Sequence, residues 1–275
     1  GGEGLEYYYD RILHGSQGYS SQQVDTGLRS IFGSTAENTH SYEGYNIHLT
    51  LDSHIQFVVE QQLDKLQEQT KADRITILAM DPMTGKILAM GSRPTFDPND
   101  FINSTAEQRK NLAISLTYEP GSTFKIITGA AALEEGILTP DTVYHDPGYL
   151  RISNRTITNW DSYVKSHGDI TFSEAMQQSS NVVLAQVGEK LGKQKFYTYL
   201  QAFGFGKKTG VDLAGEESGL LLPINDVRPI DLATMSFGQT NLVTPIQLLT
   251  AVCAIANGGT LYQPYIVEKI TDSQG

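Results

Sequence analysis

One stretch of the sequence, YEPGSTFKIITGAAALEEG at residues 118–136, constrains the fold more than any other. Its apolar residues recur at the spacing of a buried helix, which is predicted to begin at or near Ser122. Lys125 follows three residues after Ser122, and residues at this spacing share one helical face. The stretch therefore predicts a serine hydroxyl and a lysine amine side by side at the start of a core helix.

Such a pair has a definite chemistry. A serine hydroxyl becomes a nucleophile only when a base takes its proton, and a lysine amine is a base only when it is neutral. Burial and the positive end of a helix both lower a lysine pKa. Ser122 is therefore predicted to be a nucleophile and Lys125 its base. The same spacing occurs at Ser162 and Lys165, but in the polar run NWDSYVKSHG with no apolar helix behind it, which predicts an ordinary loop.

A second polar cluster interrupts a helical sequence 57 residues after Ser122. Thr171 with Glu174 forms a capping box that predicts a helix start. Ser179-Ser180-Asn181 then separates two apolar helical stretches. Hydroxyl and amide side chains at such a break are either a simple polar junction or part of a site.

The remaining elements follow from local signals. Asp52 is a good helix N-cap, and residues 74–92 alternate around a DPMTG turn as an antiparallel hairpin does. Residues 93–110 are predicted to be a surface loop, and residues 136–168 show little periodicity. Thr244 with Gln247 caps a last helix, and the YIVEKI run is a predicted strand.

Composition excludes several classes of function. The net charge is −11 over 275 residues, which argues against a nucleic-acid partner. The single cysteine, Cys253, excludes an internal disulfide and lies in an apolar run predicted to be core. No apolar stretch approaches the length of a membrane span, and the histidines and carboxylates show no metal-ligand spacing, so no metal and no cofactor is expected.

Many spaced motifs resemble one family in its own order. They are LTLDSHIQ, ILAMDPMTGKILAM, YEPGSTFK, HGDITF, SSN, FGFG followed by TGVDLAGE, SFGQTNLVTPIQL and ANGG. The chain resembles the D,D-transpeptidase domain of class B penicillin-binding proteins, nearest the septal-division and sporulation branch. The resemblance implies an α+β fold like that of the serine β-lactamases, with an antiparallel sheet flanked by helices. It also implies that residues 1–45 are the tail of an N-terminal pedestal domain and that residues 46–275 are the transpeptidase domain.

The resemblance implies peptidoglycan crosslinking through a serine acyl-enzyme that β-lactams also form. Ser122 would attack the D-Ala-D-Ala amide of a stem peptide, and Lys125 would take its proton. Ser179 would pass a proton to the leaving group, and Asn181 would hold the peptide backbone. Trp160 is either a core or loop anchor or, by the resemblance, an aromatic side chain that lines the cleft.

The family's third motif is a Lys-Ser/Thr-Gly on a strand at the edge of the cleft. Lys208-Thr209-Gly210 matches it in letters but lies inside a glycine-rich turn, 29 residues after Ser179 and before the helix that precedes this motif in the family. Lys208 is therefore predicted not to be catalytic. On this reading the transpeptidase domain would be incomplete at its C-terminal end, would lack its last strands, and would be inactive alone.

Two other functions remain open. A serine β-lactamase would need a deacylating base, and Glu216 and Glu217 have the sequence of turn residues. A β-lactam sensor or an inactive scaffold could be built on the same fold. The resemblance implies stem peptides and β-lactams as ligands, a glycosyltransferase and division or sporulation proteins as partners, and a place on the extracytoplasmic face of a bacterial membrane, tethered by an anchor outside this chain.

Overall fold

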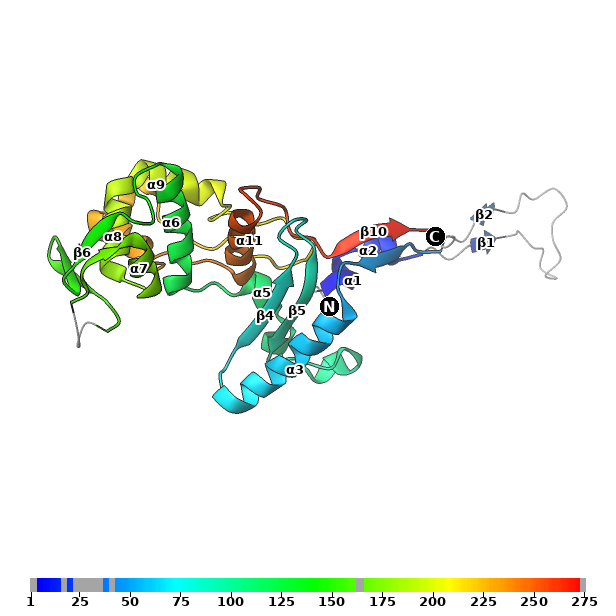
Figure 1. Ribbon diagram of the computed structural model, residues 1–275. Helices are drawn as coiled ribbons and strands as arrows, with labels where there is room; N and C mark the ends of the chain where they lie inside the picture. The colour runs from blue at the N-terminus through cyan, green and yellow to red at the C-terminus, as the bar shows by residue number, and fades with distance from the viewer. Residues whose placement is uncertain (1–3, 16–18, 22–36, 40–42, 162–165, 273–275) are drawn as a thin grey trace, which may run out of the picture.

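The computed structural model describes residues 4–15, 19–21, 37–39, 43–161 and 166–272. The molecule is elongated (Figure 1). A helical lobe that holds α6 to α9 lies at one side, the hairpin β4–β5 with α3 lies beyond α11, and a thin arm leads to the C-terminal strand β10.

The described part contains helices and short strands in mixed order. The helices are α1 (Gly4–Tyr8), α2 (Asp10–Leu13), α3 (Ser53–Thr70), η1 (Pro98–Asn103), α4 (Ala106–Arg109), α5 (Leu112–Ser115), η2 (Gly121–Phe124), α6 (Lys125–Glu134), α7 (Phe172–Gln177), α8 (Asn181–Leu191), α9 (Lys193–Ala202), η3 (Ile224–Asp226), α10 (Pro229–Met235) and α11 (Pro245–Ala256). The strands are β1 (Tyr19–Ser21), β2 (Glu37–Thr39), β3 (Asn46–Leu49), β4 (Ile75–Met80), β5 (Ile87–Arg93), β6 (Val143–Asp146), β7 (Tyr149–Ile152), β8 (Arg155–Thr158), β9 (Gly168–Thr171) and β10 (Val267–Thr271).

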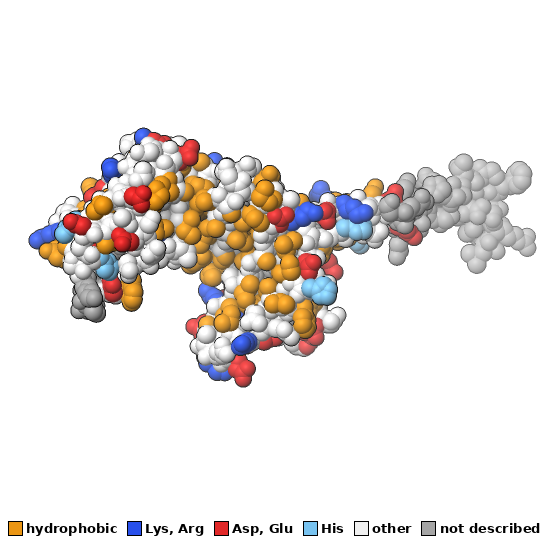
Figure 2. Space-filling view, viewed as in Figure 1, with side chains coloured by type: hydrophobic (Ala, Val, Ile, Leu, Met, Phe, Trp, Pro, Cys, Tyr) orange, Lys and Arg blue, Asp and Glu red, His pale blue; other side chains and the backbone are white. Residues whose placement is uncertain are grey.

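The hairpin and its helix form as the sequence predicts. Strand β4 pairs antiparallel with β5, and the carboxylate of Asp52 accepts from the first amides of α3. Val59 and Leu63 of α3 pack with Ala89 of β5 in a small core. Among the described residues β4 pairs with β5 alone, and hydrophobic side chains gather on the surface around the hairpin and α11 (Figure 2).

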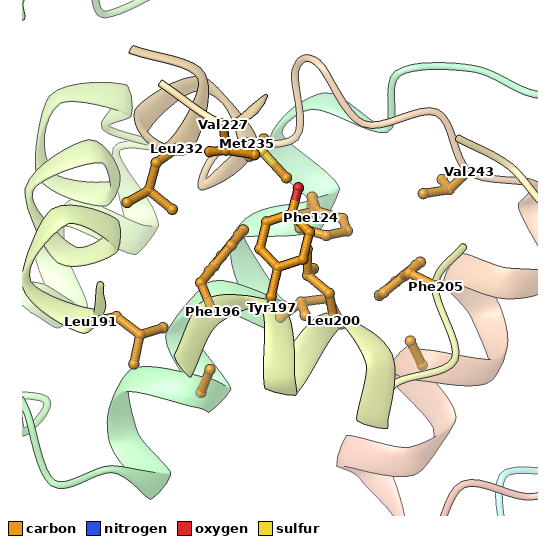
Figure 3. Close-up of a cluster of buried hydrophobic side chains, with 13 residues drawn as sticks. Phe124, Leu191, Phe196, Tyr197, Leu200, Phe205, Val227, Leu232, Met235 and Val243 are labelled. Atoms are coloured by element: carbon orange, nitrogen blue, oxygen red, sulfur yellow. The ribbon is translucent and has the colours of Figure 1, made fainter. Parts of the chain in front are cut away.

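The helical lobe has two hydrophobic clusters. One joins η2, α6, α9, α10 and α11, and in Figure 3 Phe124 points into it beside Tyr197, Leu200 and Met235. The other packs α7 and α8 against small strands of residues 143–171. Helix α6, which follows Ser122, contacts α8, α9 and α11 and so lies inside the lobe.

Several local predictions need correction. Residues 136–168 contain β6, β7 and β8, and β6 pairs with β9 while β7 pairs with β8. A strand of four residues is too short for an alternating pattern to stand out in the sequence. The predicted surface loop at residues 93–110 contains the short helices η1 and α4, and α10 was not predicted at all. The capping boxes of α7 and α11 and the burial of Cys253 are as predicted.

The N-terminal segment is attached to the C-terminal strand. Strand β3 pairs antiparallel with β10, and Tyr9 of the first helical segment donates to the carboxylate of Asp212 at 2.8 Å. The same carboxylate accepts from the backbone amides of Ile266 and Val267. The described elements give an α+β protein, as predicted. In this part of the chain, no helix has both the length and the apolar character needed to cross a membrane.

Candidate active site

Ser122 lies in a 3-10 turn, and the α-helix proper begins at Lys125. The next residues of the turn anchor it, since Phe124 is fully buried and its ring lies 5.1 Å from that of Phe205. Ser122 itself is exposed to solvent. The fold thus holds a serine hydroxyl at the surface on a turn whose neighbouring side chain, Phe124, is fixed in the core.

A second backbone segment closes over this turn. The amide of Gly121 donates to the carbonyl of Gly238 at 2.9 Å, and Thr128 of α6 donates to the carbonyl of Ser236 at 2.8 Å. Gly238 has a φ of 83°, and a Cβ on it would come within 2.1 Å of the Gly121 carbonyl oxygen. Only glycine fits this left-handed position at such a close approach.

Lys125 is buried, with 2% of its surface exposed. Its Nζ donates to the Ser179 carbonyl at 2.6 Å and to the Ser179 hydroxyl at 2.9 Å. Burial lowers the pKa of Lys125 to about 8. The Ser179 hydroxyl in turn lies 3.0 Å from that of Ser122, so the amine reaches the serine through Ser179.

The polar cluster at residues 179–181 is the junction between α7 and α8. Ser180 is the N-cap of α8, and its hydroxyl accepts from the amide of Val183 at 3.0 Å. Ser179 has a φ of 55°, a left-handed conformation that is uncommon for a residue with a side chain. This turn aims the Ser179 hydroxyl at both Lys125 and Ser122.

Asn181 and Trp160 lie at the same junction. The Asn181 side chain donates to the Thr158 carbonyl at 3.0 Å. Trp160 is 74% exposed, so it is not a core residue, and its indole donates to the Gln178 carbonyl at 3.2 Å. The hydrogen bond holds the exposed Trp160 ring at residue 178, one residue before Ser179, so an aromatic surface lies beside the hydroxyls.

Beneath the junction lies a buried network that sequence reasoning did not single out. The carboxylate of Asp146 is fully buried and accepts from Asn159, Ser180 and His167. The other ring nitrogen of His167 lies 2.9 Å from Asp161. The only signal was the HGDITF run, which carried the resemblance but no assigned role.

Lys208 lies in a turn whose contacts are separate from those of Ser122, Lys125 and Ser179. It is exposed, and the next two residues, Thr209 and Gly210, both donate to the carboxylate of Glu216. The hydrogen bonds of Thr209 and Gly210 reach Glu216, Gln263 and Val211, and none reaches Ser122. Glu216 is buried and fastens this turn.

Two other sequence signals give no site in the described structure. Ser162 and Lys165 lie outside the described residues. Within those residues, no three or more histidine, cysteine and acidic side chains cluster as metal ligands would. A cavity of about 440 Å³ lies beside Tyr197 and Leu222, and none of the three site side chains lines it.

The chain matches the model of the penicillin binding protein transpeptidase domain over residues 75–275. It is 41% identical over 271 residues to stage V sporulation protein D of Bacillus subtilis, which covers 98% of this chain and 42% of the relative. It is 33% identical over 276 residues to penicillin-binding protein PbpB of Mycolicibacterium smegmatis, covering 99% of this chain and 42% of that protein. The chain thus spans less than half the length of either relative.

Solved structures give the same answer. The complex of penicillin-binding protein 3 of Mycobacterium tuberculosis with ampicillin superposes with a TM-score of 0.86 at 31% identity, covering 99% of this chain and 56% of that one. Penicillin-binding protein 2X of Streptococcus thermophilus gives 0.84 at 28% identity, covering 98% and 40%. The fold, the serine turn and the family match agree with one another, and the chain belongs to the penicillin-binding protein transpeptidase family.

Proposed function

We propose that this chain carries the acylation machinery of a peptidoglycan D,D-transpeptidase, with Ser122 as the nucleophile and Lys125 as its base. The observation that carries the proposal is the chain of contacts from Lys125 through Ser179 to Ser122, at 2.9 and 3.0 Å. A hydroxyl both donates and accepts, so with a neutral amine the Ser122 hydroxyl donates to Ser179 and the Ser179 hydroxyl donates to Lys125 Nζ, the reverse of the resting directions. The Ser122 proton then moves to Ser179 while the Ser179 proton moves to the neutral amine.

The same three groups serve the second half of acylation. The amine, now charged, returns its proton through Ser179 to the nitrogen that leaves with D-Ala. The acyl group stays on Ser122 until the amine of a second stem peptide takes it, which forms the crosslink. A β-lactam presents a similar amide and acylates the same hydroxyl.

Two further side chains have substrate-binding roles in this proposal. Asn181 is held through its amide nitrogen by the Thr158 carbonyl, which turns its side-chain oxygen toward other donors, such as a substrate amide. Trp160 presents an exposed aromatic face for the substrate's apolar part. Asn181 lies two residues after Ser179, and Trp160 reaches the same junction through its hydrogen bond to the Gln178 carbonyl.

The test is covalent labelling. The complete protein is purified, incubated with a fluorescent penicillin, digested, and mapped by mass spectrometry. The adduct is expected on the EPGSTFK peptide at Ser122, and Ser122→Ala should abolish it. An adduct on Ser179, or on the Ser162 of the second Ser-x-x-Lys, would overturn the assignment.

A second measurement separates the transpeptidase from a β-lactamase. The lifetime of the labelled protein is followed over hours after free penicillin is removed. A transpeptidase keeps its acyl group, because it holds no base poised to activate water. Rapid loss of the label with release of hydrolysed penicillin would favour the β-lactamase. A stable label without crosslinking of stem peptides by the protein would favour the sensor.

The setting of the reaction follows from the proposed substrate. Peptidoglycan lies outside the cytoplasmic membrane, so the site acts on the extracytoplasmic face of the bacterial cell membrane. We propose an anchored protein that works with a glycosyltransferase and with proteins of division or sporulation. The similarity to stage V sporulation protein D supports the sporulation branch.

A further inference from the structure

The Ser179 turn rests on one buried carboxylate. Asp146, at the end of β6, has no exposed surface, and its oxygens accept from the Gly148 amide, the Asn159 side chain and the Ser180 hydroxyl at 2.7–3.0 Å. A buried carboxylate without donors would be costly, and here every contact comes from a donor. Asp146 is therefore a hub that fixes the side chains around it.

Two of those side chains continue into the candidate site. The Ser180 hydroxyl accepts from the Val183 amide, and the side-chain Oδ1 of Asn159 accepts from the backbone amides of Asn181 and Val182 at 2.8 and 3.1 Å. Together they satisfy three amides of the first turn of α8, whose amides have no partner within the helix. Asp146 thereby holds the residues that directly follow the left-handed Ser179.

His167 clamps the hub from its other side. Its Nδ1 lies 2.9 Å from Asp146 and its Nε2 lies 2.9 Å from Asp161. An ionised carboxylate can only accept, and a neutral imidazole donates from one nitrogen alone. Both contacts are satisfied together only when the ring carries both protons, so the geometry is that of an imidazolium between two carboxylates.

The contacts of His167 also connect to the exposed ring of Trp160. Asp161 follows Trp160 directly in the sequence, and the Trp160 indole donates to the Gln178 carbonyl, one residue before Ser179. The His167 ring thus ties two segments together. One carries Ser179 through the Asp146 hub, and the other carries Trp160 through Asp161.

We propose that Asp146 and His167 are positioning residues, which hold Ser179 and Trp160 in the acylation geometry through a proton-dependent carboxylate–imidazolium–carboxylate clamp. The inference rests on the proposed function, since it assigns a task to the Ser179 turn. Neither side chain touches the reacting atoms. Loss of the ring proton leaves one nitrogen facing a carboxylate without a hydrogen and loosens one side of the clamp.

The direction of the pH dependence follows from the same contacts. The hydrogen bond to Asp161 raises the pKa of His167 above 6.5, burial opposes it, and Asp146 adds to it. A raised pKa means that the clamp is complete below pH 6.5 and is lost as the pH rises through the raised value. Among the described residues, Asp146 and Asp161 are the charged groups in hydrogen-bond contact with the ring. Burial raises the pKa of Asp146, but its hydrogen-bond donors lower that pKa by more, so Asp146 stays ionised.

The first experiment uses the only tryptophan of the chain as a reporter. Trp160 fluorescence is recorded from pH 5.5 to 9 in the full chain and in His167→Gln. The wild type should show a transition above pH 6.5 that His167→Gln lacks. The matched control is His145→Gln, because the imidazole of His145 also contacts an aspartate at 2.6 Å but is 69% exposed, and that aspartate is Asp169 rather than Asp146 or Asp161. Its transition should equal that of the wild type.

The second experiment measures acylation of Ser122 by a fluorescent penicillin at pH 6.5. His167→Gln and Asp146→Asn should slow the acylation rate constant by about tenfold or more, because small misplacements of catalytic groups have effects of this order. Tyr197→Phe controls for lost stability, since it removes a buried hydrogen bond to the Leu222 carbonyl elsewhere in the lobe. It should lower the unfolding temperature and leave the acylation rate unchanged.

The two experiments can fail separately. A missing Trp160 transition in the wild type, one that survives in His167→Gln, or wild-type acylation rates in both variants would overturn the clamp while Ser122 acylation stands. A rate loss in Tyr197→Phe equal to that in His167→Gln would reduce the effect to stability and also overturn it. Failure of the wild type to be acylated, with the transition intact, would overturn the proposed function and leave the clamp.

Discussion

Lys125 and Ser179 are joined twice, because the buried amine donates to both the hydroxyl and the carbonyl of the same serine. The carbonyl contact fixes the amine, and the hydroxyl contact gives it a path to Ser122. The sequence placed Ser122 and Lys125 on one helical face, but the structure inserts a third residue between them. In the proposed mechanism Lys125 therefore acts as a base through Ser179, which the same contacts hold in place.

Acylation should therefore depend on pH through Lys125. Burial lowers the pKa of this amine to about 8, so its neutral fraction rises as the pH passes 8. In His167→Gln, which lacks the clamp at every pH, the acylation rate constant should rise about tenfold per pH unit below that midpoint and level off above it. The wild type should show the same ascending limb, reduced at higher pH by loss of the His167 ring proton. Stopped-flow measurement of penicillin acylation across pH 6–9 checks this, and a flat profile would contradict it.

Lys125→Met should remove labelling of Ser122 and change how stability depends on pH. The unfolded lysine titrates at 10.5 and the folded one at about 8, so between these values the unfolded chain binds the extra proton. Stability of the wild type, relative to Lys125→Met, should rise by roughly 3 kcal/mol as the pH goes from 8 to 10.5. Urea unfolding of both proteins at a series of pH values measures the difference, and a constant difference would exclude a depressed pKa.

Lys208→Ala should change the acylation rate by less than about threefold, because an exposed turn lysine contributes little. The measurement is the same labelling assay, with Glu216→Gln as a companion that loosens the turn itself. A loss of two orders of magnitude in Lys208→Ala would mean that this Lys-Thr-Gly lines the cleft.

Gly238→Ala should damage both stability and acylation. Its Cβ would meet the Gly121 carbonyl oxygen at 2.1 Å, so the serine turn must move. Gly258→Ala is the matched control, because Gly258 has a φ of 87° and open space around its Cβ position. The control should lose about 1 kcal/mol from backbone strain alone and keep its acylation rate. Equal losses in both variants would show that the close approach does not position Ser122.

The sequence predicted what is decided locally. The capping boxes of α7 and α11 use residues three apart, and both form with the predicted partners. The DPMTG turn fixed the hairpin for the same reason, since turn chemistry and alternation lie within one segment. The family motifs placed Ser122, Lys125 and Ser179, and the structure brings these three side chains together.

What the sequence could not show depends on partners far apart in the chain. The contact between Asp146 and Ser180 spans 34 residues, and nothing in either local segment distinguishes that aspartate from the others. Strands β6 to β8 have four residues each, which is too few for a periodic pattern. Tertiary contacts impose the left-handed conformation of Ser179, and no glycine at this position signals it in the sequence.

The closure of the Gly238 segment over the serine turn bears on how the protein is made. Thr128 and Ser236 are bonded across 108 residues, and Ser179 meets Ser122 across 57. Contacts of such range form late, because the chain must first close long loops. During synthesis the EPGSTFK segment emerges well before its partners, and a domain folds only as its parts become available. We expect the hydroxyl to be no more reactive than that of any other serine until the ribosome has released residues beyond Gly238, so a β-lactam finds no target in the nascent chain.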